Sequence, residues 1–182
     1  MPAIAIGQKS KKAKEKARND SLYKMTLQMM DRFNLDSSGY HGQIKFDTIF
    51  YDPKKIKSIG SFAIDRNEKK LDYKIGKWTE YYENGQVKSI GEYQMSYVMA
   101  CRSAMPDLAY YSYKIGSWTY YHVNGQVMAT GKYDLDKQKV FTGIANQFAK
   151  KSVVSNYWFF YDSDGQIASD KQKIIADLDK LE

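Results

Sequence analysis

Few residues in this 182-residue chain belong to the types that carry out chemistry. The histidines are His41 and His122, and the single cysteine is Cys101. A thiol beside an imidazole can form a nucleophilic pair, but no local signature and no orienting third group accompany Cys101 and His122. The sequence contains no phosphate-binding loop, dinucleotide fingerprint, paired carboxylate motif or zinc spacing. We therefore expect a protein that is not an enzyme and that uses no cofactor or metal.

The most regular feature of the chain is a spacing of forty residues between Trp78, Trp118 and Trp158. A glycine follows each tryptophan seven residues later, namely Gly85, Gly125 and Gly165. Self-similarity at a fixed period means that one supersecondary unit has been copied, so the fold is predicted from that unit. His122 stands where other copies have Tyr82 and Asp162, and this variation predicts a structural role for it.

Each unit is predicted to be a hairpin. Asn84-Gly85 and Asn124-Gly125 lie between segments rich in Tyr, Trp, Thr and Val. Asn-Gly predicts a two-residue type I′ turn, in which both turn residues have a positive φ. The resulting register places rings opposite glycines: Trp78 with Gly91, Tyr93 with Gly76, Trp118 with Gly131 and Tyr133 with Gly116. A ring over a cross-strand glycine covers bare backbone, so each tryptophan is expected to stabilise its own hairpin.

Four hairpins are expected, at 45–62, 75–93, 115–133 and 155–173. They predict a mainly β protein with a twisted, elongated antiparallel sheet, and the sixteen tyrosines favour strands as well. The outer copies depart from the pattern. Asp47 occupies the tryptophan position of the first copy, where Asp52-Pro53 also replaces Asn-Gly, and Lys171 occupies the glycine position of the last. Such departures are typical of terminal, capping repeats.

The pattern Gly-x-Trp-x-x-Tyr-x-x-Asn-Gly-x-x-x-x-x-Gly-x-Tyr resembles the MORN-repeat variant of bacterial proteins, many of which are labelled YwqK-type antitoxins. It is carried by Gly76, Trp78, Tyr81, Asn84, Gly85, Gly91 and Tyr93, and then by Gly116, Trp118, Tyr121, Asn124, Gly125, Gly131 and Tyr133. The resemblance covers residues 45–173 with interruptions. It implies a sheet of hairpins used in scaffolding, dimerisation or lipid-headgroup binding. The forty-residue spacing is longer than is usual in that family.

The tyrosines are the candidate binding residues. Tyr81, Tyr121 and Tyr161 share one position of the unit, on the face opposite the tryptophans. Tyrosine is enriched at protein interfaces, where it acts as an anchor. We expect a non-catalytic protein–protein interaction or scaffold module that binds its partner through Tyr81 and Tyr121, with Tyr97, Tyr110 and Tyr111 from an insertion. A structural subunit of a larger assembly is an alternative.

Two insertions lengthen the period, at 94–112 and at 134–155. The first is rich in tyrosine and is expected to lengthen the flanking strands into an outer hairpin, with Pro106-Asp107 as its turn. The second has helical spacing at Val140, Phe141, Ile144, Phe148 and Ala149, which favours a helix although Gly143 interrupts it. Long loops in a repeat array often form its binding face, so both insertions are candidates for partner specificity.

Helices are expected at both ends of the array. Residues 21–35 predict an amphipathic helix, whose stripe consists of Leu22, Met25, Met29 and Phe33. The stripe is expected to pack on a sheet face, and a Met-rich groove for a partner is the alternative. Residues 174–182 predict a short C-terminal helix. Gly39 and Gly42 mark the exit from the first helix into the first hairpin.

The net charge of +7 is concentrated at the N-terminus. Residues 1–20 contain Lys9, Lys11, Lys12, Lys14, Lys16 and Arg18 against two acidic residues. A solvated tail or helix start is the commoner meaning of such a run, and the alternative is attachment to an anionic membrane surface or nucleic acid. No segment approaches eighteen apolar residues, so no transmembrane segment is expected. The chain as written predicts a cytoplasmic protein, or an envelope or exported one if an upstream signal peptide has been lost.

Overall fold

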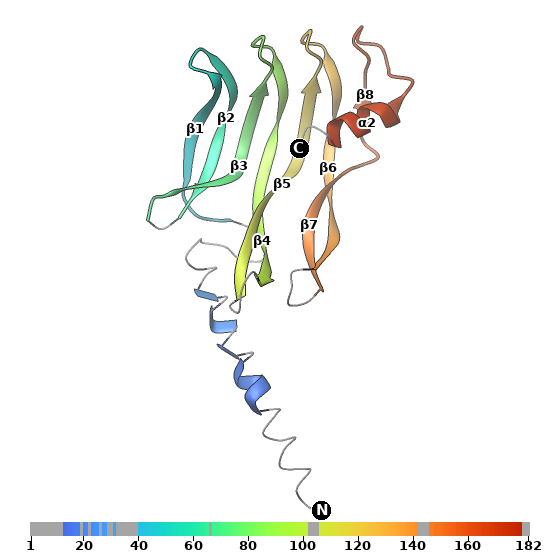
Figure 1. The fold of residues 1–182 in the computed structure, drawn as a ribbon. Helices are drawn as coiled ribbons and strands as arrows, with labels where there is room; N and C mark the ends of the chain where they lie inside the picture. The colour runs from blue at the N-terminus through green and yellow to red at the C-terminus, as the bar shows by residue number, and fades with distance from the viewer. Residues whose placement is uncertain are drawn as a thin grey trace, which may run out of the picture.

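The computed structural model describes residues 13–18, 20, 21, 23–25, 27, 28, 31, 40–65, 67–101, 106–141 and 146–179. This part of the chain forms one twisted antiparallel sheet (Figure 1). Its strands are β1 (Ile44–Asp52), β2 (Lys55–Ile64), β3 (Lys70–Tyr81), β4 (Val87–Cys101), β5 (Pro106–Tyr121), β6 (Val127–Phe141), β7 (Asn146–Val154) and β8 (Phe159–Phe160). Strands β1 to β7 pair in chain order, and β8 pairs with β6. The predicted mainly β fold is confirmed.

Helical segments flank the sheet on both sides in the sequence. Helix α2 (Lys171–Asp179) begins three residues before the predicted C-terminal helix. The described residues between 13 and 31 are helical as well, and Lys14, Lys16 and Arg18 are exposed on them. Most of the predicted stripe, Leu22, Met29 and Phe33, lies outside the described residues, as do Lys9, Lys11 and Lys12.

The hairpin turns are not of the predicted type I′. Gly85 has a φ of 85°, but Asn84 is not among the described residues with a positive φ. The Gly85 N–H donates to the Tyr82 carbonyl at 2.9 Å, and the Tyr82 N–H donates to the Gln86 carbonyl at 2.8 Å. This is a three-residue loop, in which a type I turn ends on a left-handed glycine. Asn84 supports it through its side chain, because its Oδ1 accepts the Gln86 N–H at 3.0 Å.

A β-bulge then restores the predicted register. Tyr81 pairs with Val87, but Glu80 pairs with Ser89, so Lys88 is an extra residue on β4. Beyond the bulge the pairing follows the prediction, with Trp78 opposite Gly91 and Gly76 opposite Tyr93. The hairpin of β5 and β6 repeats this arrangement, with Trp118 opposite Gly131 and Gly116 opposite Tyr133. The bulge compensates for the longer turn, so the register was predicted correctly from a wrong turn.

The tryptophan rings lie on the preceding hairpin and not on the glycine of their own. A Cβ added at the glycine would lie within 2.4 Å of the ring in three contacts: Trp78 on Gly60, Trp118 on Gly91 and Trp158 on Gly131. The predicted contact within one hairpin is therefore wrong. Each tryptophan joins two consecutive repeats, and the glycine is required because a side chain there would occupy the space of the ring.

Extra residues at each junction bring the rings into this position. Ile59 pairs with Thr79 and Ser61 pairs with Ile75, so one residue of β2 lies opposite three residues of β3. The junction of β4 and β5 has the same surplus of two residues. The two extra residues bend the later strand, as a bulge does, and bring its tryptophan over the backbone of the earlier strand. The indole N–H of Trp78 then donates to the Ser61 carbonyl at 3.1 Å.

These contacts join the rings of one sheet face into a continuous row, which we call the aromatic row. It runs through Phe62, Trp78, Tyr93, Trp118, Tyr133, Trp158 and Phe160, and successive centroids lie 5.0 to 6.3 Å apart. Most neighbours meet edge to face, the arrangement that aromatic quadrupoles favour. Helix α2 lies at the end of the row, where Leu178 belongs to the same buried cluster as Trp158 and Phe160.

A second set of contacts joins the hairpin tips, which lie side by side along the upper edge of Figure 1. The Tyr82 hydroxyl donates to the Tyr121 carbonyl at 2.8 Å, and His122 hydrogen-bonds the Tyr161 carbonyl at 3.0 Å. The Asn84 amide donates to the Val123 carbonyl at 3.1 Å. This hydrogen bond between neighbouring tips fits the structural role that was predicted for His122.

Beyond the aromatic row the sheet divides into three parts that do not pair with one another through their backbones, which we call blades; β1 is paired along β2 in the first of them. Pairing of β3 with β4 ends at Gly76, and pairing of β5 with β6 ends at Gly116. Both glycines have positive φ, 66° and 64°, with open space around them, so they are needed for the backbone bend. The blades are β2–β3, β4–β5 and β6–β7.

The blades account for the two insertions. The expected outer hairpin of 94–112 is confirmed, but Pro106 pairs with Cys101 and Asp107 with Ala100, so neither forms the turn. The helix expected in 134–155 is wrong, because this segment is the β6–β7 blade. Every side chain from Asp134 to Lys139 on β6 is exposed, and all of them except Leu135 are polar. The helical spacing of the five apolar residues was a coincidence.

The ring contact predicts unequal costs for two glycine substitutions. Gly91→Ala should lower the free energy of unfolding by about 3 kcal/mol, because its Cβ would overlap the Trp118 ring. Gly85→Ala should cost about 1 kcal/mol, because it meets only the penalty of a positive φ. Urea denaturation measures both. An equal or smaller cost at Gly91 would contradict the role given to the tryptophans.

Candidate binding surfaces

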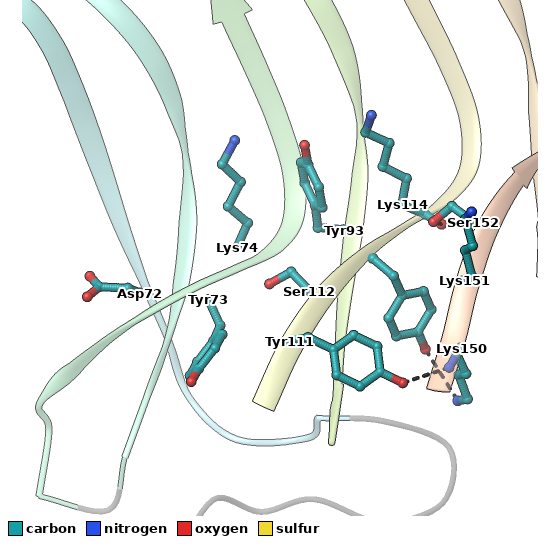
Figure 2. Close-up of a pocket in the computed structure, with 11 residues that line it drawn as sticks. Asp72, Tyr73, Lys74, Tyr93, Tyr111, Ser112, Lys114, Lys150, Lys151 and Ser152 are labelled. Carbon is teal, nitrogen blue, oxygen red and sulfur yellow. Dashed lines mark hydrogen bonds between the residues drawn. The ribbon is translucent and has the colours of Figure 1, made fainter. Parts of the chain in front are cut away.

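A hollow of about 440 Å³ lies where the blades separate (Figure 2). Strands β3, β4, β5 and β7 line it, and its walls carry mainly lysine, tyrosine and serine side chains. The lining residues are Asp72, Tyr73, Lys74, Tyr93, Tyr111, Ser112, Tyr113, Lys114, Lys150, Lys151 and Ser152. Four lysines and one aspartate are thus among the lining residues, in a space of the size that small ligands occupy.

Lys74 and Lys114 come from equivalent positions of two repeats, four residues before a tryptophan. The Lys74 Nζ lies 4.8 Å from the Trp78 ring centroid and 2.6 Å from the Glu80 carboxylate. The Lys114 Nζ lies 5.3 Å from the Trp118 centroid, 5.6 Å from that of Tyr120 and 5.5 Å from that of Tyr133. Cation–π attraction favours such positions, so the aromatic row carries a charge at each of these two repeats.

Lys150 and Lys151 reach the hollow from β7, which is attached to β5 by side chains. The Lys150 N–H donates to the Tyr111 hydroxyl at 2.7 Å, and its Nζ donates to the Tyr113 hydroxyl at 3.3 Å. Ser152 Oγ donates to the Lys114 carbonyl at 2.8 Å. These bonds hold the third blade against the second and place the two lysines at one side of the hollow (Figure 2).

Ser112 contributes a buried hydroxyl. Among the described residues its Oγ has no hydrogen-bond partner. Ser112 pairs with the fully buried Met95 on β4, and its side chain points toward the space between β3 and β5 (Figure 2). A buried hydroxyl without a partner has a free-energy cost, and such a group calls for an explanation.

The opposite face of the sheet carries the repeated tyrosines, and we call it the tyrosine face. Side chains alternate along a strand, so Thr79 and Tyr81 lie on this face while Trp78 and Glu80 lie on the other. Its aromatic–aliphatic pairs cross four hairpins: Phe50 with Ile56, Tyr81 with Val87, Tyr121 with Val127 and Tyr161 with Ile167. Phe46 and Phe159 lie on the same face and are 67% and 63% exposed.

The predicted binding tyrosines fall into two groups. Tyr81 and Tyr121 are half-buried on the tyrosine face, and Tyr81 also lines a groove of about 450 Å³ between the first two hairpin tips. Tyr97 and Tyr110 instead pack against a buried cluster that contains Ile75 and Met95, and Tyr111 anchors β7. The structure therefore does not bring the five together in one surface.

The other candidates for chemistry also stay apart. His122 is at a hairpin tip, whereas Cys101 is the last residue of β4, at the far end of a blade. Among the described residues no group of three or more His, Cys, Asp and Glu side chains could hold a metal ion. Over the same residues, no helix is long and apolar enough to cross a membrane.

A comparison with protein families identifies the repeat unit. Residues 74–95 match the MORN repeat variant. The matched segment runs from Lys74 on β3 through the tip to Met95 on β4, so the MORN-type unit here is one hairpin with the start of its blade. No curated protein and no solved structure gives a significant match.

The lysines of the hollow were missed by sequence reasoning. Lys74 and Lys114 are forty residues apart and precede the same Ile-Gly-x-Trp motif, and this recurrence was the available signal. Lys150 and Lys151 gave none, because the segment that holds them was expected to be helical. Their place near the MORN-type unit follows from the hollow, which they line together with Lys74 and Tyr93.

Glu80 links this site to the stability of the fold. Burial raises the pKa of Glu80, but the charge and hydrogen bond of Lys74 outweigh it, so the pKa is lowered from its ordinary value. A lowered folded-state pKa adds stability above the unfolded value of about 4.3, and that contribution is lost as the pH falls below it.

Glu80→Gln should therefore be less stable than the wild type at neutral pH, and the difference in stability should narrow as the pH falls below about 4.3. Chemical denaturation along a pH series measures the gap. Glu83→Gln, at an exposed turn position, is the control. A gap at Glu80 that does not change with pH would show that the Lys74 pair contributes no stability.

Proposed function

We propose that this chain is a non-catalytic module that binds another protein through its tyrosine face. The observation that carries the proposal is the continuity of apolar side chains across all four hairpins on that face. Phe46, Phe50, Ile90 and Phe159 remain 42% to 67% exposed there. Large exposed apolar patches on soluble proteins mark interaction sites.

The arrangement of the face supports a protein partner. Thr48, Thr79, Thr119 and Thr130 form a row beside the aromatic–aliphatic pairs, and Lys77 and Glu92 pair at the border on the same face. Apolar and aromatic anchors within a polar rim are the anatomy of protein interfaces. The tryptophans contribute to the other face and are buried, so they support the sheet that presents the anchors.

The sheet itself is suited to presenting a surface. Its repeats are joined by the aromatic row and by hydrogen bonds between tips. The aromatic–aliphatic pairs of the tyrosine face are therefore held in fixed relative positions in the unbound protein. A rigid surface loses little conformational entropy on binding, which favours affinity. A structural subunit of a larger assembly would use the same face in the same way.

Tyr81→Ala and Tyr121→Ala should abolish capture of the partner from a lysate of the native host while changing the melting temperature little, because both side chains are only half-buried. Phe148→Ala is the matched control, because Phe148 is an exposed aromatic residue on β7 and is not one of the four aromatic–aliphatic pairs of the tyrosine face. Quantitative mass spectrometry of the captured proteins gives the readout. If the captured proteins are the same for all three variants, the tyrosine face is not the binding surface.

A second candidate function rests on the exposed Lys14, Lys16 and Arg18 of the N-terminal helical residues. They suit attachment to an anionic membrane surface or to nucleic acid. Deletion of residues 1–20 should then remove binding to anionic vesicles or oligonucleotides, and that binding should weaken steeply with salt. Unchanged binding after the deletion would eliminate this candidate.

A further inference from the structure

We propose that the groove between the first two hairpin tips, which we call the tip groove, binds a loop of the partner protein through asparagine and glutamine side chains. The inference deepens the proposed function and rests on it, because Tyr81 belongs both to the tyrosine face and to the lining of this groove. It adds the chemistry of the partner at this margin of the face, namely side-chain carboxamides.

The tip groove has a volume of about 450 Å³ and lies between the β1–β2 tip and the β3–β4 tip, at the upper edge of Figure 1. The Tyr51 hydroxyl donates to the Tyr81 carbonyl at 2.9 Å across these two tips. The Tyr82 hydroxyl makes the equivalent bond to the Tyr121 carbonyl between the next two tips. The first tip is therefore joined to the second in the same way as the second is joined to the third.

Asparagine side chains fill the equivalent space between the later tips. The Asn84 amide donates to the Val123 carbonyl at 3.1 Å, and the Asn124 amide donates to the Ser163 carbonyl at 2.9 Å. Each of these junctions thus contains a carboxamide that donates a hydrogen bond to the backbone of the following tip.

A glutamine side chain accompanies each asparagine. A Cβ added at Gly125 would lie 2.9 Å from Gln86 Oε1, and one added at Gly165 would lie 2.7 Å from Gln126 Oε1. The amide oxygen of each glutamine therefore lies against the glycine of the following tip. Two carboxamides, one as a donor and one through its oxygen, fill each later junction.

The first junction lacks both side chains. In the repeat, Pro53 stands at the position of Asn84, and Lys55 stands at the position of Gln86. Proline has no side-chain amide, and the lysine side chain carries an ammonium group in place of an amide oxygen. The tip groove is thus the space that two carboxamides occupy in the other junctions.

Two groups of the second tip consequently face an open space. In the described part of the chain no hydrogen bond reaches the Glu83 carbonyl, which has the place of the Val123 carbonyl in the next tip. A Cβ added at Gly85 would meet nothing within 4 Å, whereas Gly125 has the glutamine oxygen beside it. The Glu83 carbonyl can accept a donor, and Gly85 leaves room for an amide oxygen.

A carboxamide suits this combination of groups better than a carboxylate does. Its NH₂ group can donate to the Glu83 carbonyl, and its oxygen can accept from Lys54 or Lys55, which line the groove from the first tip. A carboxylate would be attracted to the same lysines but has no hydrogen to donate. The Glu83 carbonyl would then stay unpaired, which costs binding free energy.

The chain itself shows which peptide arrangement carries the two carboxamides. In both later junctions they come from one turn with the sequence Asn-Gly-Gln, at 84–86 and at 124–126. An asparagine and a glutamine two residues apart on a turn therefore reach both the carbonyl and the glycine of one tip. The partner presents a loop of this kind at the margin of the tyrosine face.

The first experiment titrates the full chain with a disulfide-closed peptide that contains Glu-Asn-Gly-Gln, the sequence of residues 83–86, and follows the backbone amide signals by NMR. Closing the peptide reduces the entropy that a loop loses on binding. Saturable shifts are expected at residues 54–56 and 81–85, which line the groove. No saturable shift at these residues would overturn the site.

An altered peptide tests the chemistry of recognition. Replacing its asparagine with aspartate should weaken binding about fivefold, the effect of losing one hydrogen bond. The added negative charge acts in the opposite direction, because it would favour binding beside Lys54 and Lys55. Equal or tighter binding of the aspartate peptide would show that the groove selects for charge and would overturn the carboxamide assignment.

A variant that fills the groove with the chain's own side chains is the second test. Asp52→Glu, Pro53→Asn, Lys54→Gly and Lys55→Gln together give the first tip the sequence of the second. The melting temperature should rise and peptide binding should be lost. Asp164→Asn is the matched control, because it adds an asparagine at an exposed tip position that does not line the groove. Equal peptide affinity in the four-residue variant and the control would overturn the proposal.

Tyr121→Ala separates the tip groove from the rest of the tyrosine face, because Tyr121 lies on that face and does not line the groove. This variant should bind the peptide as the wild type does. If Tyr121→Ala still captures the partner, the proposed function fails, and the peptide titrations still decide whether the groove binds carboxamides. If the four-residue variant loses the peptide but captures the same partner, the proposed function stands and this inference fails.

Discussion

The whole sheet depends on a close contact between an indole ring and a bare stretch of backbone in the hairpin before it. The rings of Trp78 and Trp118 occupy the space where a side chain at Gly60 or Gly91 would begin. A hairpin of two strands is barely stable alone, and additional strands with a buried face are needed. These contacts provide that face, because they convert separate hairpins into one aromatic row. The turn bulge, the surplus residues at each junction and the bend at Gly76 all serve to place the rings.

The contact also gives the two faces of the sheet different roles, one buried and one exposed. The tryptophan face is filled by its own rings and by α2, so its stability does not require a partner there. The tyrosine face can then keep Phe50 and Ile90 exposed without loss of the fold. The division of the sheet into blades adds a third region, where lysines and hydroxyls replace apolar side chains. Surfaces with different chemistry are thus supported by the same small motif.

Sequence reasoning recovered the part of this structure that is encoded locally. Asn84-Gly85 marked the hairpin, and alternation then assigned Tyr81 and Trp78 to opposite faces. The turn type was predicted wrongly, because the Asn84 side chain stabilises a three-residue loop. The dipeptide Asn-Gly alone does not distinguish this loop from a two-residue turn. The ring contact was missed because the turn predicts strand pairing only within one hairpin. The pairing between two hairpins depends on the two extra residues in the later strand, and the sequence of a single hairpin does not reveal them. The β6–β7 blade was missed for a related reason, since its few apolar residues fit two periodicities and pairing with the neighbouring strand decided between them. The hollow could not be predicted, because its lysines come from β3, β5 and β7, which are not neighbours in the sheet and line one space only in the folded chain.

The contact between repeats has a direction, because the tryptophan of one hairpin always packs on the glycine of the hairpin before it. The first hairpin has Gly60 but carries Asp47 in place of the tryptophan, and the last has Trp158 but carries Lys171, the first residue of α2, in place of the glycine. The first unit therefore has nothing to insert into a neighbour before it, and the last has no opening for a neighbour after it. The glycine–tryptophan contact thus joins the described repeats to one another, and the outer side of the first and of the last of them lacks one of its two residues.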